Sequence, residues 1–82
     1  MPTATVVNLA AVERFRRAKE LEWRIKQHTT DWPVKAETSW QGEDVVVRTE
    51  MYLPHIVCVS ITRYASDGTV QGPTSHAEER TH

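Results

Sequence analysis

Four histidines and one cysteine are the residues of this chain that could ligate a metal ion. His55 and Cys58 stand three positions apart, a spacing that points two side chains to opposite faces of a β-strand. A structural zinc site needs four converging ligands, usually in two close pairs, and a single cysteine does not supply them. We therefore expect neither a metal site nor a bound cofactor.

Cys58 and Ser60 are also candidate nucleophiles. Their activation would need a histidine and an acid, for which the candidates are His55, His28 and Asp44. No nucleophile elbow, oxyanion loop or other local signature of such an enzyme surrounds them. Phosphate binding is not indicated either, because no glycine-rich loop precedes a helix. The sequence therefore predicts a protein without catalytic residues.

Arginines beside a tryptophan are the one pattern that favours nucleic-acid binding. Arg16, Arg17 and Arg24 lie near Trp23 on one side of a predicted helix, where the indole could stack on a base. Two glutamates interrupt that side, however, and a pI of about 6.4 is far from the basic footprint of such proteins. Weak, salt-sensitive binding through the basic helix is therefore kept as an alternative function.

Apolar residues outside the predicted core indicate an interaction surface instead. Trp23 faces away from the apolar side of the helix, and Val46 and Ile56 face away from it on the predicted sheet. Tryptophan and arginine are enriched at interface hot spots. We expect a small non-enzymatic protein-interaction or regulatory module that self-associates or binds a macromolecule, with no membrane contact. Its predicted partner-binding residues are Trp23, Arg16, Arg17, Arg24, Val46 and Ile56.

A small-ligand site is the third hypothesis. Trp32, Trp40 and Tyr52 would line it. Arg48 or Arg63 would be its charged anchor. Such sites are mostly apolar and carry a few polar groups that orient the ligand.

A change of hydrophobic period near residue 28 predicts the elements that carry these residues. Between Asn8 and His28 the apolar residues recur at helical spacing, and from Val34 onward they alternate as in half-buried strands. This predicts a helix over 8–28, capped by Asn8, and strands near 34–40, 45–51 and 56–64, with a possible short fourth strand at 69–71. The expected fold class is α+β, with one long N-terminal helix packed on a three- to four-stranded antiparallel β-meander.

Alternation also predicts which strand residues face the helix. Apolar residues at odd positions should point toward it, and Val46, Ile56 and Cys58 should form an exposed patch on the other face. The most buried residues should include Phe15, Ile25, Val47 and Val59. The odd-numbered strand residues concerned are Val45, Val47, Val57, Val59 and Ile61.

Length and composition set the domain organisation. A chain of 82 residues has room for one domain, which we place at 1–73, and the polar segment 74–82 is predicted to be disordered. No secretory signal or membrane span is visible, and the lone cysteine allows no internal disulfide, so we expect a soluble cytoplasmic protein. A short, arginine-rich chain without motifs is typical of phage and mobile-element accessory proteins.

Overall fold

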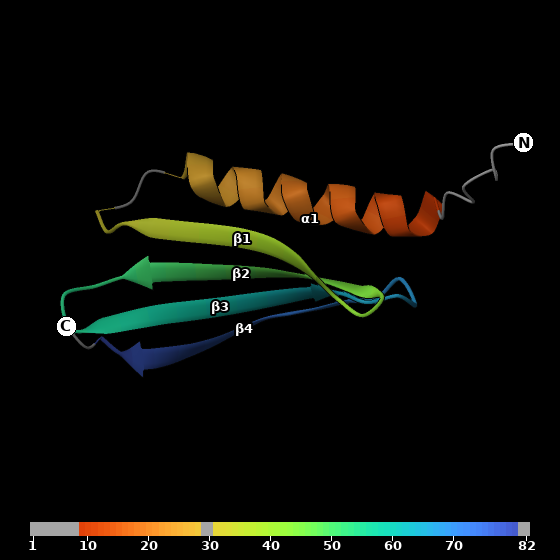
Figure 1. Cartoon of the computed structure of the whole chain (residues 1–82). Helices are drawn as coiled ribbons and strands as arrows, with labels where there is room; N and C mark the ends of the chain where they lie inside the picture. Colours follow the sequence, from red (N-terminus) through yellow and green to blue (C-terminus); the bar gives the residue numbers. More distant parts are fainter. Residues whose placement is uncertain (1–8, 29–30, 81–82) are drawn as a thin grey trace, which may run out of the picture.

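One helix packs on a four-stranded antiparallel sheet (Figure 1) in the computed structural model, which describes residues 9–28 and 31–80. The helix α1 spans Leu9–Gln27, and the strands are β1 (Val34–Gln41), β2 (Asp44–Tyr52), β3 (Ile56–Tyr64) and β4 (Val70–Glu79). Their order in the sheet is β1-β2-β3-β4, so each strand pairs with its neighbours in sequence. The predicted α+β fold class is confirmed. The proposed cap Asn8 lies outside the described residues.

Glycines permit the sheet's tightest turn and its one irregularity. Gly42, in the connection that leads from Gln41 to its partner Asp44, has φ 63°, a conformation that side chains disfavour. Gly72 has φ 97° and lies at a bulge between β3 and β4. A side chain there would place its Cβ 2.6 Å from the Ile61 carbonyl oxygen, so the bulge requires glycine.

The strand β4 corrects the prediction of a disordered tail. Residues 74–79 belong to β4 and pair with β3 from Thr74 opposite Ile61 to Glu79 opposite Ile56. The Arg80 amide extends the ladder by donating to the His55 carbonyl over 3.0 Å. Strand pairing uses main-chain groups, which hydrophobic periodicity does not report, and therefore the polar composition of this segment misled the prediction. Residues 81–82 of the predicted tail lie outside the described residues.

The face assignment of β3 also differs from the prediction. Tyr52 pairs with Val57, so an even number of residues separates these partners and odd positions of β2 face even positions of β3. Val47 consequently shares its face with Thr62, whereas Val59 lies on the opposite face. The sequence pattern did not indicate this pairing register, because β2 is apolar on both faces. The three valine and isoleucine residues that lie away from the helix on β3 are Val57, Val59 and Ile61.

The helix covers the β1 and β2 half of the sheet. Ala18 of α1 is fully buried against Val45 and Val47 of β2. At the β1 edge, Phe15 stacks on Trp40 with ring centroids 5.5 Å apart and planes 6° from parallel. Val47 and Val59 are buried as expected, whereas Phe15 and Ile25 are only partly buried. The helix-side core is therefore small and lies off the centre of the sheet.

Candidate interaction surface

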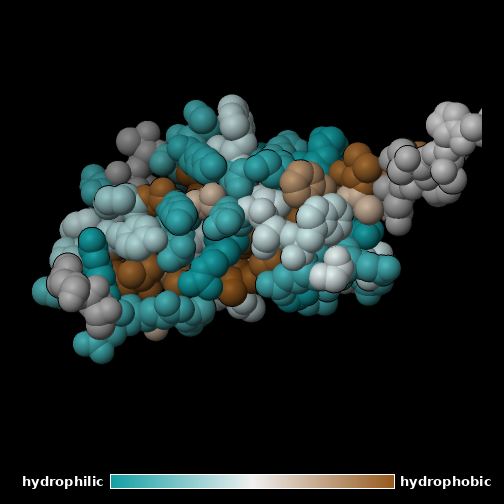
Figure 2. All heavy atoms as spheres, in the orientation of Figure 1, coloured by the Kyte–Doolittle hydropathy of each residue, from teal (hydrophilic) through white to brown (hydrophobic). Residues whose placement is uncertain are grey.

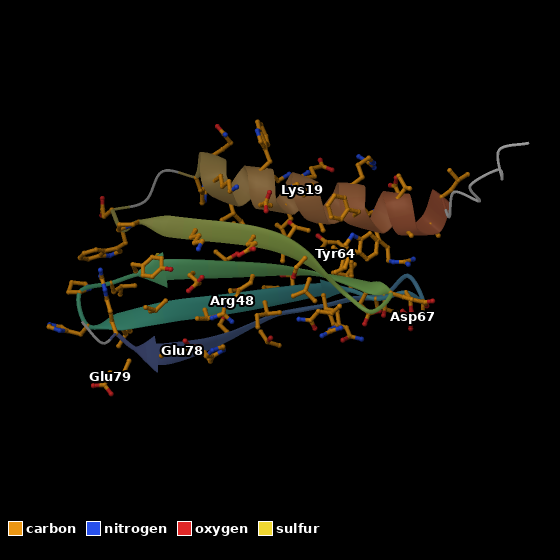
Figure 3. The ribbon with its side chains drawn as sticks, in the orientation of Figure 1. Lys19, Arg48, Tyr64, Asp67, Glu78 and Glu79 are labelled. Carbon is orange, nitrogen blue, oxygen red and sulfur yellow. The ribbon has the colours of Figure 1, made fainter. Side chains whose placement is uncertain are left out.

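Charged side chains close the outer face of the sheet, the face that points away from α1. Val46 is 4% exposed and Val59 is fully buried, although α1 lies on the other face of the sheet. Arg48 pairs with Glu50 and Glu78 at 3.8 Å, and Figure 3 labels Arg48 and Glu78, which lie on the strands that flank β3. The stems of such side chains can cover apolar neighbours while their charged ends remain in water. The prediction that Val46 lies in an exposed apolar patch is therefore wrong.

The same outer face carries a short acid–histidine contact on β4. His76 Nε2 lies 2.7 Å from Glu78 Oε2. This hydrogen bond is the main cause that lowers the pKa of Glu78, and Arg48 adds a favourable charge. On the face in view in Figure 2, hydrophobic residues appear as separate patches between hydrophilic side chains. On the outer face, this acid–histidine pair thus lies next to Arg48.

Arg63, one proposed ligand anchor, fastens one end of the sheet. Its Nη1 donates to Asp44 Oδ2 over 2.7 Å, and its Nη2 donates to Gln41 Oε1 over 2.7 Å. The Ser66 amide donates to the other Asp44 oxygen over 2.8 Å. This amide first, and Arg63 second, lower the pKa of Asp44. Arg63 therefore has a structural partner on each side of its guanidinium group.

The aromatic residues of the small-ligand hypothesis do not line one site. Trp32 precedes β1, whereas Trp40 lies near its far end, so about 26 Å separates them at roughly 3.3 Å per residue. Tyr52 lies beside the start of β1, since its amide donates to the Pro33 carbonyl over 2.9 Å. Trp40 is instead stacked on Phe15.

The helix arginines are ion-paired within the helix. Arg16 donates to both oxygens of Glu13, at 2.6 and 3.0 Å, and Arg17 donates to the same carboxylate at 3.2 Å. Arg24 donates to Glu20 over 2.9 Å. The hydrogen bond from Arg16, followed by that from Arg17, lowers the pKa of Glu13 to about 2. This pairing favours a solvated, charge-balanced helix surface over a phosphate-binding one.

The structure does not join the predicted partner-binding residues into one patch. Trp23 is 61% exposed and lies on α1 with the arginines. Ile56 is exposed at the start of β3 and shares the helix-side face with Cys58 and Tyr64. Val46 is buried on the outer face. The predicted site thus divides into three separate places.

On the helix side of the sheet, α1 packs on β1 and β2 and leaves β3 and β4 largely uncovered. In Figure 1, β1 is the strand nearest to α1 and β4 the furthest. Every residue of β4 is exposed. Between α1 and these strands runs a groove of about 410 Å³, which we call the helix–sheet groove. Its lining residues are Leu21, Ile25, Thr49, Ser60, Thr62, Tyr64, Val70, Gly72 and Pro73.

Apolar walls and a hydroxyl floor give this groove its chemistry. Leu21 and Ile25 form the helix wall, and Val70 lies at the opposite side, 53% exposed. Ser60 and Thr62 lie between them on β3. Sequence reasoning missed the groove, because its position depends on where the helix lies across the sheet. The one available signal was the run of small polar residues at even positions of β3.

A smaller cavity of about 280 Å³ lies between the start of α1 and the β3–β4 connection. Its charged residues already have partners. Arg14 donates to the carbonyls of Glu43 and Ser66, at 3.1 and 3.5 Å, and Arg17 pairs with Glu13. These contacts of Arg14 therefore anchor the start of α1 to the turns of the sheet.

The predicted nucleophiles lie on the helix-side face of β3. Ser60 Oγ is 3.5 Å from Ser75 Oγ, and Cys58 is a free, partly buried thiol opposite Ala77. His76 pairs with Val59 and therefore points to the outer face. Among residues 9–28 and 31–80, no three histidine, cysteine, aspartate or glutamate side chains form a group that could hold a metal ion.

No protein-family model, curated protein or solved structure matches this chain. Within the part of the chain that the structure describes, no helix has the length and apolar character needed to cross a lipid bilayer.

Proposed function

We propose that this chain is a small non-enzymatic protein-interaction or regulatory module that works as an oligomer or in complex with a macromolecular partner. The observation that carries the proposal is the uneven cover of the sheet. One helix covers β1 and β2, charged side chains close the outer face, and the helix-side face of β3 and β4 stays open beside the helix–sheet groove.

The energetics of β4 support a partner on this side of the molecule. Ordering the backbone of one residue costs about 1–2 kcal/mol. A main-chain hydrogen bond returns about 0.5–1.5 kcal/mol net. β4 is ten residues long, has no residue buried and, among the strands that the structure describes, pairs with β3 alone. A second chain that covered β4 would add the burial that this strand lacks.

The chemistry of the groove fits a protein surface better than a small ion or a metabolite. Leu21, Ile25 and Val70 offer apolar contact, and the hydroxyls of Ser60 and Thr62 offer hydrogen bonds. Trp23 with its neighbouring arginines would be a second, smaller contact surface. The proposal includes a cytoplasmic location and an accessory role, for which the free thiol of Cys58 and the short chain are the supporting features.

A matched pair of valines tests the proposal. Val70 in the groove and Val12 on the other side of α1 are 53% and 54% exposed, so Val70→Lys and Val12→Lys place the same charge at equally exposed positions. We expect sedimentation over a wide concentration range to show association of the parent chain that Val12→Lys leaves unchanged. A weakening by Val70→Lys would place the contact surface in the groove, and an unchanged association would place it elsewhere on β4. A monomer at every concentration whose β4 amides exchange as slowly as those of β2 would contradict the proposal, because β4 would then need no cover.

A further inference from the structure

The two edge strands of the sheet differ in how their free edges are occupied. At β1, the Thr38 amide points to the free edge and donates to Glu22 Oε1 of α1 over 2.9 Å. The second oxygen of Glu22 lies 2.7 Å from Lys19 Nζ and 3.8 Å from Lys26 Nζ. A charged group that fills an edge donor prevents another strand from pairing there. The β1 edge is therefore closed from within the chain.

Among residues 9–28 and 31–80, no side chain closes the β4 edge in this way. The Arg80 amide donates to His55 across the β3–β4 pair, and successive residues of a strand direct their main-chain groups to alternate edges. Ser75, Ala77 and Glu79 therefore point their amides and carbonyls to the free edge. All three residues are exposed. An exposed edge strand of this length is a template for strand addition.

We propose that a second copy of this chain adds to the β4 edge, antiparallel, about a two-fold axis at Ala77. This inference rests on the proposed function and names the partner within it. The axis sets His76 opposite the second copy's Glu78 on the outer face. It also sets Ser75 opposite the second copy's Glu79 on the helix side. In both pairs a side chain that can donate a hydrogen bond faces a carboxylate, and the His76 pair becomes an ion pair when the imidazole is protonated.

The charges and the proline of β4 select this register among the alternatives. An axis at Ser75 or His76 would bring Pro73, which has no amide hydrogen, into the paired region. An axis at Glu78 or Glu79 would set that carboxylate against its own copy. The axis at Ala77 pairs residues 74–80 of both copies without a proline and without facing like charges.

This pairing would also complete the open side of the molecule. A two-fold axis perpendicular to the sheet keeps the helix-side faces of both copies on one side. Both α1 helices would then lie on that side of a shared floor formed by β3 and β4 of each copy. The two helix–sheet grooves would be displaced from the axis in opposite directions, because their lining residues Val70, Gly72 and Pro73 precede Ala77. The uncovered strands would become the centre of a continuous sheet, where each is paired on both edges.

Disulfide cross-linking tests the register directly. Residues that face each other at the axis have Cα atoms about 5.5 Å apart, which a disulfide can span. We expect Ala77→Cys to form a covalent dimer under mild oxidation. The variant is made with Cys58→Ser, because Cys58 faces Ala77 on β3 and would compete within one chain. Ser75→Cys in the same background is the control, since its two copies would lie about 13 Å apart in this register.

A proline at the axis gives an independent measurement. Ala77→Pro removes an amide that points to the free edge, so the β3–β4 pairing is retained while the second copy loses a donor. We expect sedimentation to show at least a tenfold weaker association, with an unchanged circular dichroism spectrum. Equal cross-linking at positions 75 and 77 would overturn the inference, as would association that persists in Ala77→Pro without cross-linking at 77. A parent chain that is monomeric at every concentration would also overturn the inference. Each of these results would leave the proposed function standing, which is contradicted only if the β4 amides of that monomer also exchange as slowly as those of β2.

Discussion

β1 and β4 form opposite edges of one sheet, yet they differ in how far the rest of the chain covers them. β1 lies under α1, with Phe15 stacked on Trp40 and Glu22 bonded to the Thr38 amide. No residue of β4 is buried, and α1, the helix within the described residues, packs on β1 and β2 instead. A single helix is too narrow to cover four strands, so its position decides which edge is closed and which remains available. This difference, more than any single residue, is the basis of the interaction surface that we propose at β4.

The largest expected effect is the difference in stability loss between two valine truncations, one on β2 under α1 and one on β4. Val47 on β2 is buried under α1, whereas Val70 on β4 is half exposed. Val47→Ala should lower the free energy of unfolding by about 2 kcal/mol, since it removes buried methyl groups and leaves a cavity. Val70→Ala should lower it by less than about 0.5 kcal/mol in the monomer. Urea denaturation of both variants checks this, and equal losses would mean that β4 is packed as tightly as β2.

Removal of the Glu22 carboxylate should weaken the closed edge. Glu22→Ala leaves the Thr38 amide without its acceptor, and we expect a loss of about 1–2 kcal/mol in the free energy of unfolding. Glu22→Gln keeps an oxygen acceptor at the same place and should lose less. Glu20→Ala, at an exposed helix position, is the control. If all three variants unfold at the same urea concentration, the contact between α1 and β1 does not stabilise the edge.

Acid should also weaken the closed edge. The hydrogen bond from Lys19 is the main cause that lowers the pKa of Glu22 from its ordinary value near 4.5. The unfolded chain therefore binds this proton at a higher pH than the folded chain does. The stabilisation is fully present above about pH 5 and is lost as the pH falls through the lowered pKa. Thermal melts of the parent chain and Glu22→Gln between pH 7 and pH 3 should show a shallower acid decline in the variant, and parallel declines would contradict the assignment.

The smallest expected effect concerns nucleic acid, which would contact neither edge. Binding by Arg16, Arg17 and Arg24 must compete with their pairs to Glu13 and Glu20, so we expect weak affinity that falls steeply with added salt. Fluorescence anisotropy with a labelled duplex at low and physiological salt measures it. Replacement of the three arginines by glutamine should abolish the binding. Tight or salt-insensitive binding in that variant would place the nucleic-acid surface elsewhere.

Sequence reasoning succeeded where side-chain pattern and structure are directly linked. The helix and the first three strands were predicted within about two residues, because their apolar periodicity reports burial. β4 was underestimated, since main-chain pairing alone orders residues 74–79. Val59 was assigned to the wrong face, because the β2–β3 connection sets the register. Val46 was expected to be exposed, and its charged neighbours on the outer face were not foreseen as its cover.

The meander order has a consequence for solubility during synthesis and truncation. β3 is more apolar than β4, and the edge of β3 that pairs with β4 would be unpaired until β4 is in place. A chain that ends before Val70 would present the amides of Val57, Val59 and Ile61 to solvent, in a segment with the composition of aggregation-prone strands. The polar strand that follows replaces this edge with one bearing Glu78 and Glu79, from which irreversible aggregates form less readily.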